Sequence, residues 1–178
     1  MPPIYELQTL GTVGIRCYDE DNLSTATTVQ PKRLAILAYL AMAPRRRLRR
    51  RDQVVAMFWP ESDETHARGA LSQALRHLRR ALGDGVIVTQ GEEEVGVDQT
   101  RLPCDAMLLA EAVEAGDYET AVKKYRGPFF DGFHVDGASQ EFEEWVALER
   151  RRAIKGARIA AEALGRWGGD MIELEDYG

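Results

Sequence analysis

Cysteine and histidine are scarce in this chain of 178 residues, which has two of the first and three of the second. Cys17 and Cys104 lie far apart, which predicts a reduced, cytoplasmic protein with unpaired thiols. The histidines have no metal-ligand spacing with one another or with the cysteines. A Walker-type phosphate loop, a dinucleotide-binding fingerprint and a recognisable Ser, His and Asp set are also lacking. We therefore expect a protein that is not an enzyme and needs no cofactor or metal.

Long apolar runs are absent too. No stretch approaches the roughly 20 residues that a bilayer-spanning helix needs. The N-terminal segment has neither the charged nor the apolar region of a signal peptide, since it reads MPPIYELQTLG. We expect no membrane association, although a hydrophobic content of 44% permits a substantial core.

The chain as a whole is acidic, with a net charge of −6, but its basic residues are concentrated in one block. Residues 31–82 contain twelve Lys or Arg and four Asp or Glu, a balance of +8. Residues 101–178 contain ten and sixteen, a balance of −6. A basic block joined to an acidic block favours one part that faces nucleic acid and another that faces a different partner.

Residues 62–83 predict an amphipathic helix. Leucines recur at spacings of four, three and four residues, which lines one helical face. They are Leu71, Leu75, Leu78 and Leu82. Ser62 is the expected N-cap and Gly83 the expected stop. The opposite face carries arginine, glutamine and serine, which bind phosphate oxygens and base edges in a major groove. The alternative is an ordinary surface helix with solvated arginines.

The surrounding elements predict a mixed fold with an N-terminal α+β part. The predicted strands of an antiparallel meander are residues 4–10, 13–18 and 23–29. The predicted helices that follow are residues 31–43, buried on most sides, and 51–59. After the basic helix, valines on both sides of a turn at Gly91 predict a hairpin. Three strands, three helices and a hairpin are the layout of a winged helix.

Two further stretches have a strongly biased amino-acid composition. Residues 45–51 contain six arginines around Leu48, which is either a solvated loop or a contact with a phosphate backbone. Residues 127–133 are loop-like yet contain three phenylalanines, which we expect to form a plug between helices rather than a ligand site. The rest of the second half predicts an all-α part, with a helical pair around a Gly116 turn and a long helix over residues 140–167.

Several segments resemble the winged-helix DNA-binding domain of OmpR-type regulators, and more closely its version in the Streptomyces antibiotic regulatory protein (SARP) family. They are PKRLAILAYLA, RRDQVVAMFWP, ARGALSQALRHLRRALG and the hairpin after them. Two later segments resemble the family's bacterial transcriptional activator domain, which is built like tetratricopeptide repeats (TPR). They are CDAMLLAEAVEAGDYETAVKKY and RGPFFDGFHVDGASQEFEEWVALERRR. The resemblance implies a winged-helix domain over residues 1–99 and a TPR-like, incomplete activator domain over residues 100–178.

The resemblance also implies a function, that of a transcriptional activator bound to specific sites on double-stranded DNA. The resemblance implies that residues 64–82 form the recognition helix. Its implied base-reading residues are Arg68, Ser72, Gln73, Arg76 and Arg79. The implied phosphate-binding residues are Lys32, Arg33, Arg45, Arg46, Arg47, Arg49, Arg50, Arg51, His77 and Arg80. Gln73 and Arg76 are the strongest candidates, because Gln and Arg can bond two edge atoms of adenine and guanine respectively.

The helical half is implied to hold protomers together as a homodimer or to contact RNA polymerase. Residues 165–178 do not complete another helical pair, so we expect a piece of a longer protein or a shortened family member. Its last helix would then expose an apolar face to a second copy. The alternative function is a protein-interaction scaffold that uses the TPR-like half. A third hypothesis is an enzyme such as a nuclease, but the sequence has no cluster of carboxylates to support it.

Two features depart from the family pattern. Arg50 stands near the place where a hydroxyl residue usually caps the second helix, so that cap must come from elsewhere. The tip of the hairpin is Glu92-Glu93-Glu94, whose carboxylates would repel DNA phosphates. Either the wing lies away from the DNA backbone or its flank makes the contact.

Overall fold

The structure is a computed structural model that describes residues 4–19, 22–23, 29–44 and 47–165. The chain begins with a three-stranded antiparallel sheet in the order β1-β2-β3. The strands are β1 (Ile4–Gln8), β2 (Gly14–Asp19) and β3 (Asn22–Leu23). The predicted meander is confirmed. Most of the predicted third strand, residues 24–28, lies outside the described residues.

Helix α1 (Pro31–Ala41) is the buried helix that the sequence predicts. Pro31 occupies its first turn, where a missing N–H costs nothing. Every residue from position 34 to position 41 is buried, because the helix is covered on almost all sides. The helix ends at Ala41, slightly earlier than expected, and Met42 is its C-cap.

Helices α2 (Arg51–Phe58) and α3 (Glu64–Leu82) follow within the same half. The expected N-cap of α3 was wrong by one position. Asp63, not Ser62, caps the helix, and its carboxylate accepts a hydrogen bond from the backbone N–H of His66 at 3.1 Å. Both residue types cap well, so sequence alone did not separate them. Gly83 ends α3 with a φ of 86°, as expected.

The second sheet contains a strand that the sequence analysis missed. Its order is β4-β6-β5, formed by β4 (Arg49–Arg50), β5 (Ile87–Gln90) and β6 (Glu94–Val97). The predicted hairpin is confirmed as β5 and β6. The end of the arginine-rich segment is not a loop, because Arg49 pairs with Val95. Gly96 leaves room for Leu48, since a Cβ there would lie 2.5 Å from the Leu48 Cδ2 atom.

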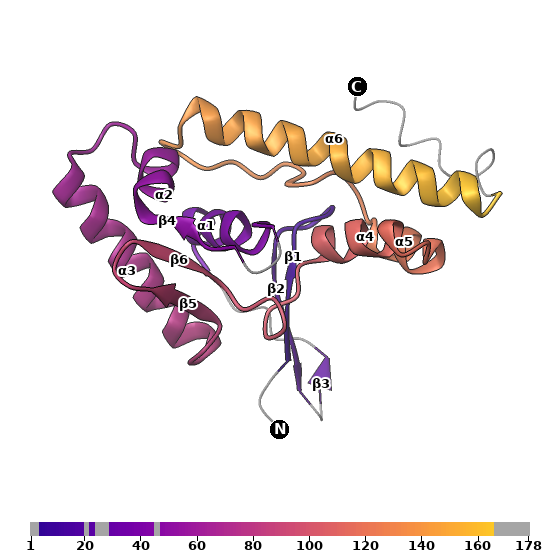
Figure 1. Ribbon diagram of the computed structural model, residues 1–178, viewed down its shortest axis with the longest axis horizontal. Helices are drawn as coiled ribbons and strands as arrows, with labels where there is room; N and C mark the ends of the chain where they lie inside the picture. Colours follow the sequence, from indigo (N-terminus) through magenta and orange to yellow (C-terminus); the bar gives the residue numbers. More distant parts are fainter. Residues whose placement is uncertain (1–3, 20–21, 24–28, 45–46, 166–178) are drawn as a thin grey trace.

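The second half is helical, as predicted. It consists of α4 (Asp105–Glu114), α5 (Tyr118–Lys124) and α6 (Gln140–Ala163). Figure 1 shows α6 running along the top of the molecule, above α1 and α2 at one end and above α4 and α5 at the other. Helix α6 ends at Ala163 rather than at residue 167. A Cβ on Gly156 would lie 2.7 Å from the Leu109 Cδ2 atom, so this glycine allows α4 and α6 to pack closely.

Aromatic side chains join the two halves, which confirms the predicted plug. Phe129 and Phe130 are buried and stack with ring centroids 4.4 Å apart. Trp145 of α6 packs edge-on against Phe129 and, 5.1 Å away, against Tyr39 of α1. Offset and edge-on pairs of this kind add to the free energy gained by burial. One hydrophobic core therefore runs through both halves of the chain.

A buried carboxylate attaches the first sheet to the helical half. Asp105, the first residue of α4, accepts hydrogen bonds from the Thr9 N–H at 2.8 Å, the Thr9 hydroxyl at 2.6 Å and the Leu10 N–H at 3.1 Å. The Leu7 N–H also donates to the Pro103 carbonyl at 2.8 Å. Strand β1 is thus held by the start of α4. Within the described ranges, no helix has the length and apolar character to cross a bilayer.

Candidate nucleic-acid interface

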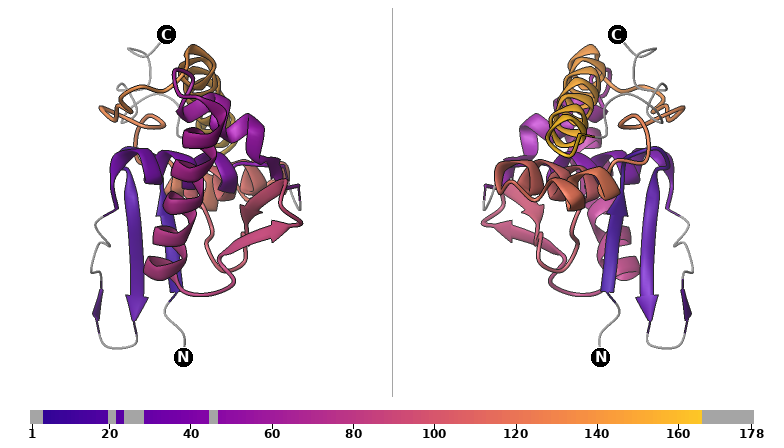
Figure 2. Two further views of the ribbon diagram at one scale, coloured as in Figure 1. Left: turned by 90° about the vertical axis from the view of Figure 1, so that its left-hand side faces the viewer. Right: turned by 90° about the vertical axis from the view of Figure 1, so that its right-hand side faces the viewer.

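Helix α3 has one buried face and one open face. Its buried residues are Ala67, Leu71, Ala74, Leu75, Leu78 and Leu82. Its exposed residues in the second and later turns are Gly69, Ser72, Gln73, Arg76, His77 and Arg80, whereas Arg68 and Arg79 are half-buried. Figures 1 and 2 place α3 at the edge of the molecule away from α4 and α5. The helical half therefore leaves the polar face uncovered.

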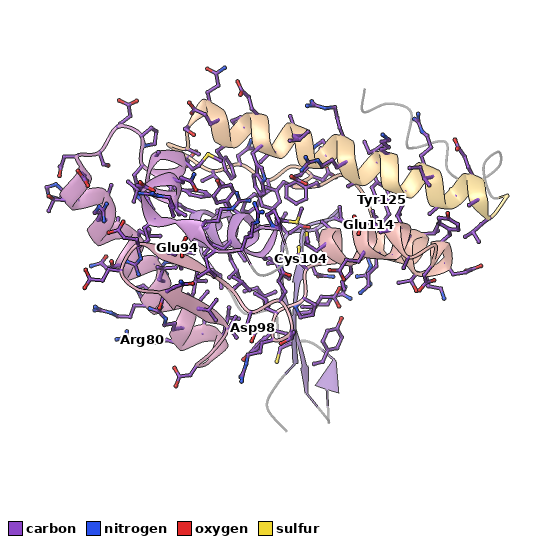
Figure 3. The ribbon with its side chains drawn as sticks, in the orientation of Figure 1. Arg80, Glu94, Asp98, Cys104, Glu114 and Tyr125 are labelled. Carbon is purple, nitrogen blue, oxygen red and sulfur yellow. The ribbon has the colours of Figure 1, made fainter. Side chains whose placement is uncertain are left out.

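Gln73 and Arg76 are the least constrained of the base-reading candidates. Within the described part of the chain, neither side chain makes a hydrogen bond or an ion pair. They lie three residues apart and so share one side of the helix. Arg80 projects from the outer side of α3 one turn further on (Figure 3).

Arg68 is engaged by two carboxylates. Its Nε donates to the Glu64 Oε1 atom at 3.0 Å, four residues earlier on α3. Its Nη1 lies 4.0 Å from the Glu93 Oε1 atom at the tip of the hairpin. DNA would have to replace these exposed ion pairs, each of which contributes little to stability in water.

The acidic hairpin tip packs at the junction of α2 and α3. The Glu93 carbonyl accepts the Arg51 N–H at 2.8 Å, and the Arg51 Nη1 donates to the Ser72 hydroxyl at 3.5 Å. Arg50 makes no side-chain cap, so the expectation of a cap from elsewhere is confirmed. The hairpin supplies a carbonyl to the first turn of α2, and the Asp52 carboxylate accepts the Gln53 N–H at 2.8 Å.

The phosphate-binding candidates fall into different environments. The Lys32 Nζ donates to the Phe58 carbonyl at 3.0 Å and lies over the Trp59 ring. Burial lowers the pKa of Lys32. The Arg49 Nε donates to the Tyr39 carbonyl at 3.1 Å, and its guanidinium stacks 3.9 Å from the Tyr39 ring centroid. These two cations take part in the packing of the fold.

The other candidates are more accessible. Arg47, His77 and Arg80 are exposed and Arg33 is half-buried. Arg50 is exposed but forms an ion pair with Asp52 at 3.0 Å, and this hydrogen-bonded partner raises the pKa of Arg50. Arg45 and Arg46 lie outside the described residues. All of these roles stay predictions.

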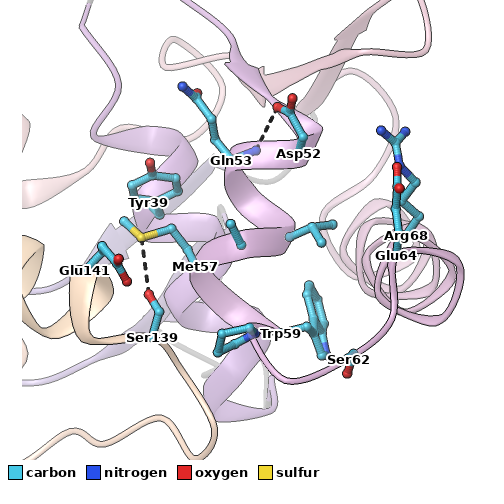
Figure 4. Close-up of a pocket in the computed structure, with 13 residues that line it drawn as sticks. Tyr39, Asp52, Gln53, Met57, Trp59, Ser62, Glu64, Arg68, Ser139 and Glu141 are labelled. Atoms are coloured by element: carbon cyan, nitrogen blue, oxygen red, sulfur yellow. Dashed lines mark hydrogen bonds and ion pairs between the residues drawn. The ribbon is translucent and has the colours of Figure 1, made fainter.

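The described residues also form hollows that were not predicted from the sequence, and one of them borders the start of α3. An open cleft of about 670 Å³ lies over α2, between the start of α3 and the start of α6 (Figure 4). In it the Ser139 hydroxyl donates to the Met57 sulfur at 3.7 Å. A groove of about 420 Å³ runs along α4 and α6, and Glu149 is among the residues that line it. The described residues contain no group of three or more acidic, His or Cys side chains that could hold a metal.

Comparison with known proteins adds one finding about the fold. No protein-family model and no curated protein matches the chain. The solved structure of Mycobacterium tuberculosis EmbR in complex with a low-affinity phosphopeptide is similar, with a TM-score of 0.60 and 20% identity. The similarity covers 92% of this chain and 47% of the EmbR chain, so this chain spans about half of EmbR. The similarity extends over both halves of this chain, and it is a similarity of fold.

Proposed function

We propose that the chain is a SARP-type transcriptional regulator, without enzymatic activity, that binds specific sites on double-stranded DNA. The observation that carries the proposal is the open polar face of α3, whose leucine face is buried in the core. A helix presented in this way fits a major groove, where Gln and Arg distinguish adenine and guanine. The similarity in fold to EmbR, a SARP-family regulator, supports the assignment.

The helical half has the second role in this proposal, which is to hold protomers together or to contact RNA polymerase. Among the described residues, the large apolar side chains that α6 exposes are Leu148 and Ile159. They are eleven residues apart and therefore lie on the same side of the helix. A dimer through this side would place two copies of α3 on repeated half-sites.

The experiment that tests the proposal is selection of bound duplexes from a random DNA pool, followed by a salt titration with the selected site. A shared sequence should emerge from the pool. Its affinity should fall steeply with salt, with a log–log slope of about −0.9 for each phosphate contact. A pool with no enrichment, or binding that does not change with salt, contradicts the proposal.

The groove between α4 and α6 favours one second candidate, a protein-interaction scaffold. Its walls include apolar side chains such as Met107 and Ile159 beside the charged Arg152. A scaffold would bind a peptide there and would show no affinity for duplex DNA. The DNA selection therefore separates the two candidates.

A further inference from the structure

Helix α3 contains a single glycine, Gly69, in its second turn. Glycine in the middle of a helix is unfavourable, because its backbone loses the most freedom on folding and it has no side chain to pack. Relative to alanine it lowers the folding equilibrium constant about two- to fivefold. A glycine at this position therefore calls for a physical reason.

Two other glycines inside helices or strands have a reason within the molecule. A Cβ on Gly156 would meet Leu109 at 2.7 Å, and a Cβ on Gly96 would meet Leu48 at 2.5 Å. Gly69 is different. A Cβ there would meet no atom within 4 Å outside its own helix, and the residue is exposed. Its φ does not lie in the left-handed region, so the backbone does not need glycine either.

Gly69 stands on the same side of α3 as the strongest base-reading candidates. Gln73 follows it by four residues and Arg76 by seven, which places the three along one stripe of the helix. The missing side chain thus lies in the surface that the proposed function turns toward DNA. A methyl group there would project about 1.5 Å beyond the Cα atom.

We propose that Gly69 is a specificity-determining position, at which the bare backbone of α3 makes close contact with the floor or wall of the DNA major groove. This inference rests on the proposed function. Glycine serves the same purpose wherever a backbone must approach a ligand closely. In this arrangement Gly69 sets the depth of α3 in the groove, and that depth allows Gln73 and Arg76 to reach the base edges.

The test uses the full chain with Gly69→Ala and Gly69→Leu, and the duplex selected by the unaltered protein. We expect Gly69→Ala to raise the folding equilibrium constant about two- to fivefold in urea denaturation, since alanine is the better helix former. We expect the same variant to bind the selected duplex about 5- to 150-fold more weakly, the range for loss of one base contact. Gly69→Leu should bind more weakly still.

Ala115→Leu, at the exposed C-terminal end of α4, is the matched control for added volume and should leave DNA affinity unchanged. Equal affinity of Gly69→Ala and the unaltered chain would overturn the inference and leave the proposed function standing. A loss of stability in Gly69→Ala would also overturn it, because the glycine would then serve the fold. If the unaltered chain selects no duplex, both the inference and the proposed function fail.

Discussion

Arg68 of the candidate recognition helix and Glu93 of the hairpin tip face each other, with the Arg68 Nη1 and Glu93 Oε1 atoms 4.0 Å apart. Glu64 holds the same guanidinium from the other side, at 3.0 Å. The pair gives one of the three hairpin-tip carboxylates, that of Glu93, a cationic partner within its own chain. The carboxylate of Glu93 lies beside arginines of its own chain, and its carbonyl completes the first turn of α2.

Replacement of Glu93 should strengthen DNA binding if the proposed function holds. Glu93→Gln removes a negative charge near the phosphates and releases Arg68 from one partner. We expect affinity for the selected duplex to rise about two- to fivefold at low salt, with a smaller gain at high salt because screening weakens both effects. Fluorescence anisotropy at two salt concentrations measures the change.

Glu92→Gln is the matched control, since it removes the same charge from an exposed neighbour for which the structure gives no ion pair with a described residue. A larger gain from Glu93→Gln than from Glu92→Gln identifies the contact with Arg68. Equal gains would assign the whole effect to repulsion of phosphate.

Arg76 and Arg47 should differ in what they contribute. Arg76→Ala should weaken binding to the selected site about 5- to 150-fold and relax the preference at one base pair, as expected for a base contact. Arg47→Ala should weaken all duplexes alike and reduce the salt slope by about one, as expected for a phosphate contact. Arg151→Ala, which removes an exposed arginine from α6, is the control. Similar effects of Arg76→Ala and Arg47→Ala on every duplex would contradict this division.

Asp105 should be important for stability, because it accepts hydrogen bonds from three donors in the segment that directly follows β1. Asp105→Ala leaves the buried N–H groups of Thr9 and Leu10 without their partner. We expect the free energy of unfolding to fall by about 1–3 kcal/mol, measured by urea denaturation. Thr9→Val removes only the hydroxyl and should cost less. An unchanged free energy of unfolding in Asp105→Ala would show that water forms hydrogen bonds with these N–H groups instead.

Two buried carboxyl groups should give the protein an unusual pH dependence. Burial raises the pKa of Asp105 and also that of Glu149, although Arg152 opposes the shift at Glu149. Between about pH 4 and these raised values, the folded chain therefore keeps protons that the unfolded chain has released. The contribution of each group to the free energy of unfolding is greatest at acid pH and falls as pH rises through this window.

Glu149→Gln separates this effect from that of the other carboxyl groups. The stability of the variant relative to the original chain should increase from pH 4 to pH 7, because only the original pays to ionise the buried group. Denaturation curves at intervals of one pH unit measure the difference. A difference that is constant with pH would show that Glu149 titrates normally.

Most of the fold could be predicted from patterns within single segments of the sequence. The leucine spacing of α3, Pro31 at the start of α1 and the valines of the hairpin each act over a few residues, and the elements that they predict are present. Strand β4 was missed because it is only two residues long and its pairing with β6 is a tertiary contact. The contact between Arg68 and Glu93, and that between Asp105 and Thr9, bring together residues too far apart for any local pattern.

The shared aromatic core has a mechanical consequence. Trp145 and Phe142 pack the first turns of α6 against Tyr39 and Phe58, while the other end of this helix, which is about 36 Å long, packs on α5. Helix α6 is thus a rigid element whose first turns are packed against the half of the chain that contains α3. If the proposed function holds, a partner bound at the far end of α6 would therefore set the position and angle at which α3 meets a duplex.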